Sequence, residues 1–260
     1  MFNKLKAWFA NDKIHQKQVY SALFTALVYT VIFNWKIALL LMASVGFHEY
    51  SHLFAARKLG MKSKGFFLVP FVGGVALVGD RYKTLWNQAI VVIAGPFGGF
   101  VLAAATAGVY LLTGIPFLAA SATWMCMLNL FNLFPFSFMD GGQLLGTLTY
   151  SINRTLGLVC TLVSTVVAVA LLMWLSPILG SMILIVGGYS LYKEIMNWKH
   201  YRNEAFYLCS VDYLFPPYRQ TKLQMAMTVV MWSLTAGLLI GLVYAMSIYP
   251  AADPGTLLAH

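Results

Sequence analysis

Charged side chains are scarce in this sequence. Asp and Glu number eight and Lys and Arg 17, so charged residues make up 10% of the 260 residues, whereas 60% are hydrophobic. The mean hydropathy is +0.75. So few charges cannot cover the surface of a water-soluble globular protein, and that class is therefore excluded.

Cysteine is also rare, because the chain has only Cys126, Cys160 and Cys209. These three are too few and too scattered for a disulfide framework or a Cys-rich zinc module. Internal repeats and low-complexity tracts are absent as well. The net charge of +9 would fit nucleic-acid binding in a soluble protein, but beside long apolar segments it indicates cytoplasmic anchoring at a membrane. We therefore expect no nucleic-acid partner.

The sequence instead contains a series of apolar segments long enough to cross a lipid bilayer. They lie near residues 18–35, 37–56, 89–112, 117–134, 155–175, 177–192 and 225–248. Residues 65–79 are also uncharged, but they are short and are interrupted by Pro70, Gly73 and Gly74. Irregular backbone at membrane depth is tolerated where it lines a cavity, which favours a re-entrant hairpin here. The predicted fold class is an all-α integral membrane protein with about six to seven transmembrane helices and a membrane-embedded re-entrant hairpin between spans two and three.

The basic residues test this arrangement, because Lys and Arg concentrate in cytoplasmic loops. With a cytoplasmic N-terminus, all of them except Lys36 fall on the cytoplasmic side. If residues 65–79 were a full span, Arg81 and Lys83 would change sides, so the charges favour the hairpin. We expect a multi-pass protein of the inner or cell membrane whose N-terminus is cytoplasmic.

One carboxylate, that of Glu49, lies where burial in the membrane should cost free energy. Glu49 falls inside the second expected span, and a carboxylate at such a depth costs about 2.5–3.5 kcal/mol. Its surroundings, His48-Glu49-Tyr50-Ser51-His52, form the HExxH pattern, which on a helix places both histidines on one face. Two imidazoles so placed can share a zinc ion, with Glu49 as general base for a water molecule. The alternative is a pair of core histidines hydrogen-bonded to neighbours, although an apolar span offers few partners.

A catalytic zinc site usually has a third protein ligand. Asp140 is the strongest candidate, since it follows Pro135, which should end or kink the fourth expected span. Gly141 and Gly142 let backbone approach closely just after the carboxylate. The charges of the ion, Asp140 and Glu49 would also cancel. The alternative is an Asp that caps a short helix beginning at Gly141.

Together these motifs resemble the site-2 protease family of intramembrane zinc metalloproteases. HEYSHLFAARKLGMKSKGFFLVPFVGG (48–74) is similar to that family's zinc helix and membrane-embedded strand, and IAGPFGG (93–99) to its third conserved region. NLFNLFPFSFMDGGQLL (129–145) resembles its Asn, Pro and Asp-Gly-Gly signature. Among subgroups, the compact layout is most similar to the bacterial sporulation-factor processing proteases.

The resemblance implies roles for particular residues. His48, His52 and Asp140 would be the ligands of one zinc ion per chain, and Glu49 would be the catalytic base. It also implies a group of substrate-binding or carbonyl-stabilising residues, namely Asn132, Gly73 and Gly74.

The expected organisation has five regions. They are a cytoplasmic N-terminus with the first span (1–36), a catalytic membrane core (37–150), two additional spans (151–192), a cytoplasmic linker rich in aromatic and basic residues (193–224), and the last span with a C-terminal tail (225–260).

The expected function is hydrolysis of a peptide bond within or near a transmembrane segment of a membrane-bound protein substrate. The active site should open to the cytoplasm, and a regulatory membrane protein is a further expected partner beside the lipid bilayer. A metal-ion transporter is one alternative, which the missing inverted repeat and the carboxylate next to the ligands oppose. An inactive protease-like membrane scaffold is another, which the intact HExxH and Asp-Gly-Gly sequences oppose.

Overall fold

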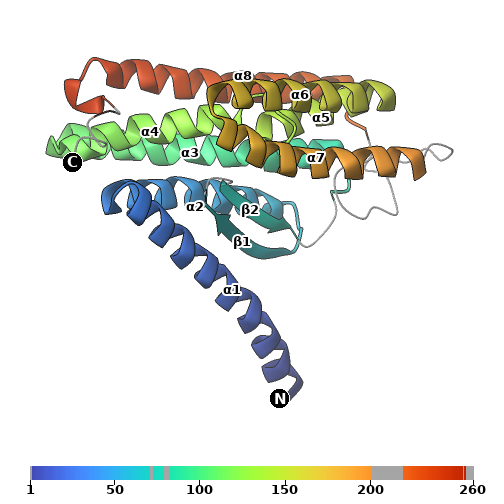
Figure 1. Cartoon of the computed structure of the whole chain (residues 1–260), viewed down its shortest axis with the longest axis horizontal. Coiled ribbons are helices and arrows are strands. Elements are labelled where there is room, and N and C mark those ends of the chain that lie inside the picture. Colours follow the sequence, from blue (N-terminus) through green and yellow to red (C-terminus); the bar gives the residue numbers. More distant parts are fainter. Residues whose placement is uncertain (1, 71–72, 79–81, 201–218, 254, 256–260) are drawn as a thin grey trace. The chain divides into compact units, whose positions relative to one another are not determined.

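The computed structural model describes residues 2–70, 73–78, 82–200, 219–253 and 255. This part of the chain is mainly helical and contains one two-stranded sheet (Figure 1). Its elements are α1 (Phe2–Ile32), α2 (Trp35–Lys58), β1 (Ser63–Val69), β2 (Gly73–Val78), α3 (Leu85–Thr113), α4 (Pro116–Asn132), α5 (Asp140–Ile152), α6 (Arg154–Leu175), α7 (Pro177–His200), α8 (Lys222–Ser247) and the short 3-10 helix η1 (Pro250–Ala252).

Four helices in the described ranges are long and apolar enough to cross a membrane, namely α2, α3, α6 and α8. This agrees with the predicted class of a helical membrane protein. Three further expected spans coincide with parts of α1, α4 and α7. The number of helices that cross the bilayer stays a prediction.

Local sequence signals explain where several helices begin. The side chain of Asn34 accepts a hydrogen bond from the amide of Ile37 at 2.9 Å and so caps the start of α2. Gly114 has a φ of 68°, which favours glycine, and Pro116 then occupies the first position of α4. The first residues of the expected linker over 193–224 are helical, because α7 continues to His200. Residues 201–218 of that linker lie outside the described residues.

The expected hairpin at residues 65–79 is an antiparallel β-hairpin. Leu68 of β1 pairs with Gly74 of β2, and Phe66 pairs with Ala76. Residues 71, 72 and 79 lie outside the described part. The depth of this hairpin in the membrane stays a prediction.

A row of polar side chains on α1 covers the outer edge of β1. Thr25 Oγ1 donates a hydrogen bond to the carbonyl of Leu68 at 2.9 Å, and the amide of Leu68 donates to Ser21 Oγ at 3.3 Å. Gln18 Nε2 donates to the carbonyl of Lys64 at 2.5 Å. These bonds satisfy backbone groups of β1 that do not face β2.

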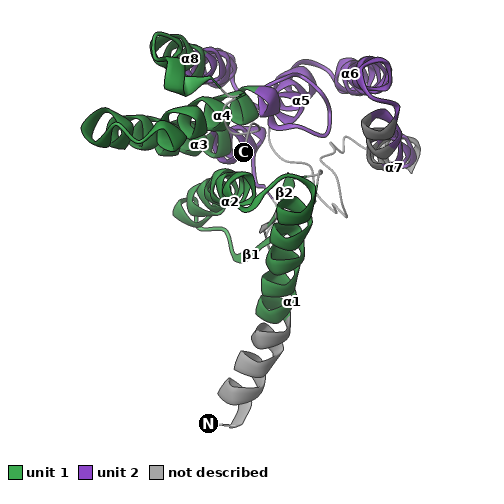
Figure 2. Cartoon of the chain, turned by 60° about the vertical axis from the view of Figure 1, so that its left-hand side comes forward, with its two compact units in different colours: residues 1–80, 94–130, 237–260 green, residues 81–93, 131–236 purple. Residues whose placement is uncertain are grey.

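The chain divides into two compact units (Figure 2). Unit 1 consists of residues 1–80, 94–130 and 237–260, and unit 2 consists of residues 81–93 and 131–236.

In unit 1, small residues allow helices to pack closely. Ile37 and Leu40 of α2 pack against Ala120 of α4. A second cluster joins α3, α4, the end of α8 and η1 through Ala107, Ala119, Ala122, Met246 and Ala252. Since Ile37 meets Ala120 and His48, further along α2, meets Asn129, further along α4, these two helices run in the same direction.

Unit 2 has its own apolar cluster, formed by Phe136, Met139 and Ala168. It also has a buried polar cluster around Gln220. The Nε2 atom of Gln220 donates to the carbonyl of Leu85 at 3.1 Å, and its Oε1 accepts from Thr228 Oγ1 at 3.2 Å. These bonds connect the starts of α3 and α8 within the unit.

Candidate metal centre

The HExxH sequence lies on α2, as predicted from its spacing. His48, Glu49 and His52 are all buried, with exposed fractions of 5%, 6% and 8%. The Nε2 atoms of His48 and His52 are 3.0 Å apart, and the two rings lie at 82° to each other. Two imidazole nitrogens bound tetrahedrally to one zinc ion at 2.0–2.1 Å would be about 3.3 Å apart. The pair is therefore already close to the geometry of a shared ion.

Asp140 is the first residue of α5 and is 7% exposed. The residue before it, Met139, has extended backbone and is the N-cap of the helix. The two glycines after Asp140 explain this sharp helix start: a Cβ at Gly141 would overlap the carbonyl of Leu133, and one at Gly142 would overlap the carbonyl of Phe136. The close backbone approach expected from the Asp-Gly-Gly sequence is present.

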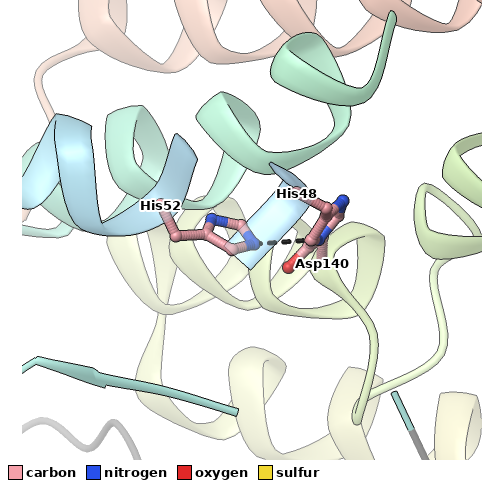
Figure 3. Close-up of side chains that lie close together, drawn as sticks. All are labelled: His48, His52 and Asp140. Atoms are coloured by element: carbon pink, nitrogen blue, oxygen red, sulfur yellow. Dashed lines mark hydrogen bonds between the residues drawn. The ribbon is translucent and has the colours of Figure 1, made fainter. Parts of the chain in front are cut away.

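Figure 3 shows His48, His52 and Asp140 with their side chains close together. The ligand atoms of these three buried residues all lie within 4.8 Å of one another. The structure thus brings together the three residues that the sequence motifs single out as metal ligands. Two imidazole nitrogens and one carboxylate oxygen form a donor set that divalent transition metals accept.

The backbone of α3 packs directly against the histidine pair. A Cβ on Gly95 would lie 2.8 Å from His48 Nε2 and would overlap the imidazole of His52. One turn later, a Cβ on Gly99 would overlap the side-chain amide of Asn129. Glycine at these positions is therefore required by close approach, although glycine inside a helix is intrinsically unfavourable.

Glu49 is covered by β2. A Cβ on Gly74 would lie 2.5 Å from Glu49 Oε1 and would overlap the rest of that side chain. Gly73 begins β2 with a φ of 104°, a conformation that L side chains rarely adopt, and its Cβ position is open. A role of Gly73 and Gly74 in substrate binding stays a prediction, as does the role of Asn132, which is the partly exposed last residue of α4.

Sequence reasoning missed one residue next to the pair. Asn129 of α4 is 1% exposed, and its Oδ1 atom lies 2.8 Å from Nδ1 of His48. The available signal was a polar amide in an apolar helix, three residues before the Asn that the family motif drew attention to.

Residues 36–123 match the sequence family described as peptidase family M50. The chain is similar to zinc metalloprotease MJ0392 of Methanocaldococcus jannaschii, with 34% identity over 117 residues, covering 41% of this chain and 32% of the relative. It is also similar to Rip3 of Mycobacterium tuberculosis, with 33% identity over 115 residues, covering 41% of this chain and 29% of that protein. The chain thus spans about a third of the length of these curated relatives.

Among solved structures, the site-2 protease from Methanocaldococcus jannaschii is similar at 23% sequence identity with a TM-score of 0.48. The match covers 75% of this chain and 90% of that one.

Proposed function

Because its segment 36–123 matches peptidase family M50, we propose that this chain is a zinc metalloprotease that hydrolyses a peptide bond in a membrane-bound protein substrate. The observation that carries the proposal is the grouping of ligand atoms from His48, His52 and Asp140 within 4.8 Å. Catalytic zinc sites take three protein ligands of these types and keep a further position open for water or substrate. The name of the relative MJ0392, a zinc metalloprotease, supports the choice of metal.

The chain's own residues would divide the chemistry between them. A zinc ion at this site would supply Lewis-acid polarisation of the peptide carbonyl and would lower the pKa of a water molecule toward about 7. His48, His52 and Asp140 would hold the ion. Glu49, on the same helical turn, would take the proton from the attacking water and return it to the leaving amine. Burial of Glu49 beneath β2 would keep bulk water away from this carboxylate.

The hairpin supports a substrate-binding role. A transmembrane helix hides its peptide carbonyls, so the substrate has to unwind before hydrolysis. The side chains of α1 occupy the outer edge of β1, whereas in the described sheet β2 pairs with β1 alone and lies against Glu49. An extended substrate segment would therefore pair with β2, where its carbonyls would come near the base.

Several expectations from the sequence remain part of this proposal. Residues 37–150 would form the catalytic core. The N-terminus and the opening of the site would face the cytoplasm, because basic residues are expected on that side of a membrane. The lipid bilayer would surround the spans, and a regulatory membrane protein would be a further partner. The resemblance to sporulation-factor processing proteases stays a prediction.

The experiment that tests the proposal replaces the proposed general base, Glu49, and leaves the three proposed metal ligands unchanged. The Glu49→Gln chain should keep its zinc and lose cleavage of a co-expressed membrane substrate, because the amide cannot accept the proton from water. His48→Ala should lose both zinc and cleavage. A metal transporter would still move its ion with Gln replacing Glu49, and an inactive scaffold would show no cleavage in the unsubstituted chain. Either result would refute the protease proposal.

A further inference from the structure

The ring nitrogen of His48 that does not face His52 also has a hydrogen-bonding partner. Its Nδ1 atom lies 2.8 Å from Oδ1 of Asn129, and both side chains are buried. The other atom of the same amide, Asn129 Nδ2, donates to the backbone carbonyl of Met125 at 2.7 Å. Asn129 thus connects the imidazole of α2 to the backbone of α4.

The bond to Met125 fixes which way the amide points. A carbonyl oxygen can only accept, so the atom facing Met125 must be the Asn129 nitrogen, and the atom facing His48 must be the oxygen. That oxygen also accepts only, which places the proton of His48 on Nδ1. The lone pair of neutral His48 is then on Nε2, the atom 3.0 Å from His52 Nε2.

The amide is also held sterically. Gly99 of α3 approaches so closely that a Cβ there would overlap the amide group of Asn129. With α3 on that side and the carbonyl of Met125 as acceptor, the amide has little freedom to rotate away from His48. The residues that hold the amide all belong to unit 1.

We propose that Asn129 is a positioning residue that locks His48 in the Nδ1-protonated tautomer and orients its Nε2 atom toward the metal. The inference rests on the proposed zinc site. Partners of this kind orient metal-binding histidines and raise the basicity of the ligand nitrogen, and their removal typically costs about 10–100-fold in metal affinity. Asn129 itself does not touch the substrate or the reacting atoms in this role.

The test compares zinc dissociation constants of the purified full-length chain, measured by competition with a chromophoric chelator. Asn129→Ala and Asn129→Val both remove the acceptor and should bind zinc about 10–100-fold more weakly. Asn129→Asp keeps an oxygen acceptor for Nδ1, although it can no longer donate to the carbonyl of Met125, so it should bind zinc more tightly than the Ala and Val chains. Thr123→Val is the matched control, because Thr123 is buried in the same helix and bonds only to the backbone carbonyl of Ala119 in the described contacts. It should leave the affinity unchanged.

Two results would overturn the proposal. Equal zinc affinity in the original, Asn129→Ala and Asn129→Val chains would show that the hydrogen bond does not support the ligand. Equal weakening in the Asp, Ala and Val substitutions would show that an oxygen acceptor for Nδ1 of His48 does not support zinc binding. If the unsubstituted chain bound no zinc, the proposed function itself would fail, which distinguishes the two failures.

Discussion

Replacing Gly95 with alanine should separate the histidine pair from its metal. The new Cβ would lie 2.8 Å from His48 Nε2, whereas ordinary contact begins at 3.4 Å. His48 would therefore have to move by the difference between 3.4 Å and 2.8 Å, about 0.6 Å, and the overlapping ring of His52 would also have to move. Metal sites hold their ligand distances to within about 0.2 Å, so a shift of this size should disrupt the coordination.

We expect zinc affinity of the Gly95→Ala chain to fall at least tenfold, which corresponds to about 1.4 kcal/mol or more. The assay is chelator competition on the purified chain, together with zinc content per chain by mass spectrometry. Gly108→Ala and Gly46→Ala are matched controls, because these glycines lie in α3 and α2 with nothing within 4 Å of their Cβ positions. Alanine there should keep zinc bound and, by its higher helix propensity, stabilise the fold by up to about 1 kcal/mol. Full zinc affinity in Gly95→Ala would refute the reasoning.

Three further changes test other parts of the structure. Gly74→Ala should displace Glu49 and reduce cleavage while zinc stays bound; unaltered cleavage would contradict the close contact with β2. Thr25→Val removes the hydrogen bond to Leu68 and should destabilise the hairpin by about 0.5–1.5 kcal/mol, seen as faster amide exchange in β1; unchanged exchange would contradict it. Gln220→Ala removes two buried side-chain hydrogen bonds and should lower the free energy of unfolding by about 1–3 kcal/mol. A denaturation curve identical to that of the original chain would contradict this prediction.

The sequence predicted the features that depend on local geometry. HExxH spacing placed His48 and His52 on one face, because a helix fixes the positions of residues four apart. Pro70 and the glycines after it predicted a hairpin and not another helix. Asp140 was identified from the Asp-Gly-Gly pattern and the family resemblance, since no local rule states that a residue so distant in the chain lies near α2.

The features that were missed depend on packing between helices. Asn129 meets His48 only because α2 and α4 pack in the same direction. Gly95 could have been noticed in the sequence, since a glycine inside an apolar helix often marks a close approach of another group to the backbone. The sequence does not say that the approaching groups are the two histidine rings. The polar row on α1 could also be predicted, because Gln18, Ser21 and Thr25 recur at helical spacing. Its partner, the strand β1, could be identified only from the fold.

The most direct measurement is the metal content of the purified full-length chain after exchange into metal-free buffer. A buried group of His48, His52 and Asp140 that serves catalysis should retain one zinc ion per chain, and His48→Ala should reduce this to background while the protein stays helical by circular dichroism. A folded, unsubstituted chain that holds no zinc under these conditions, even after zinc is supplied, would contradict the proposed metalloprotease.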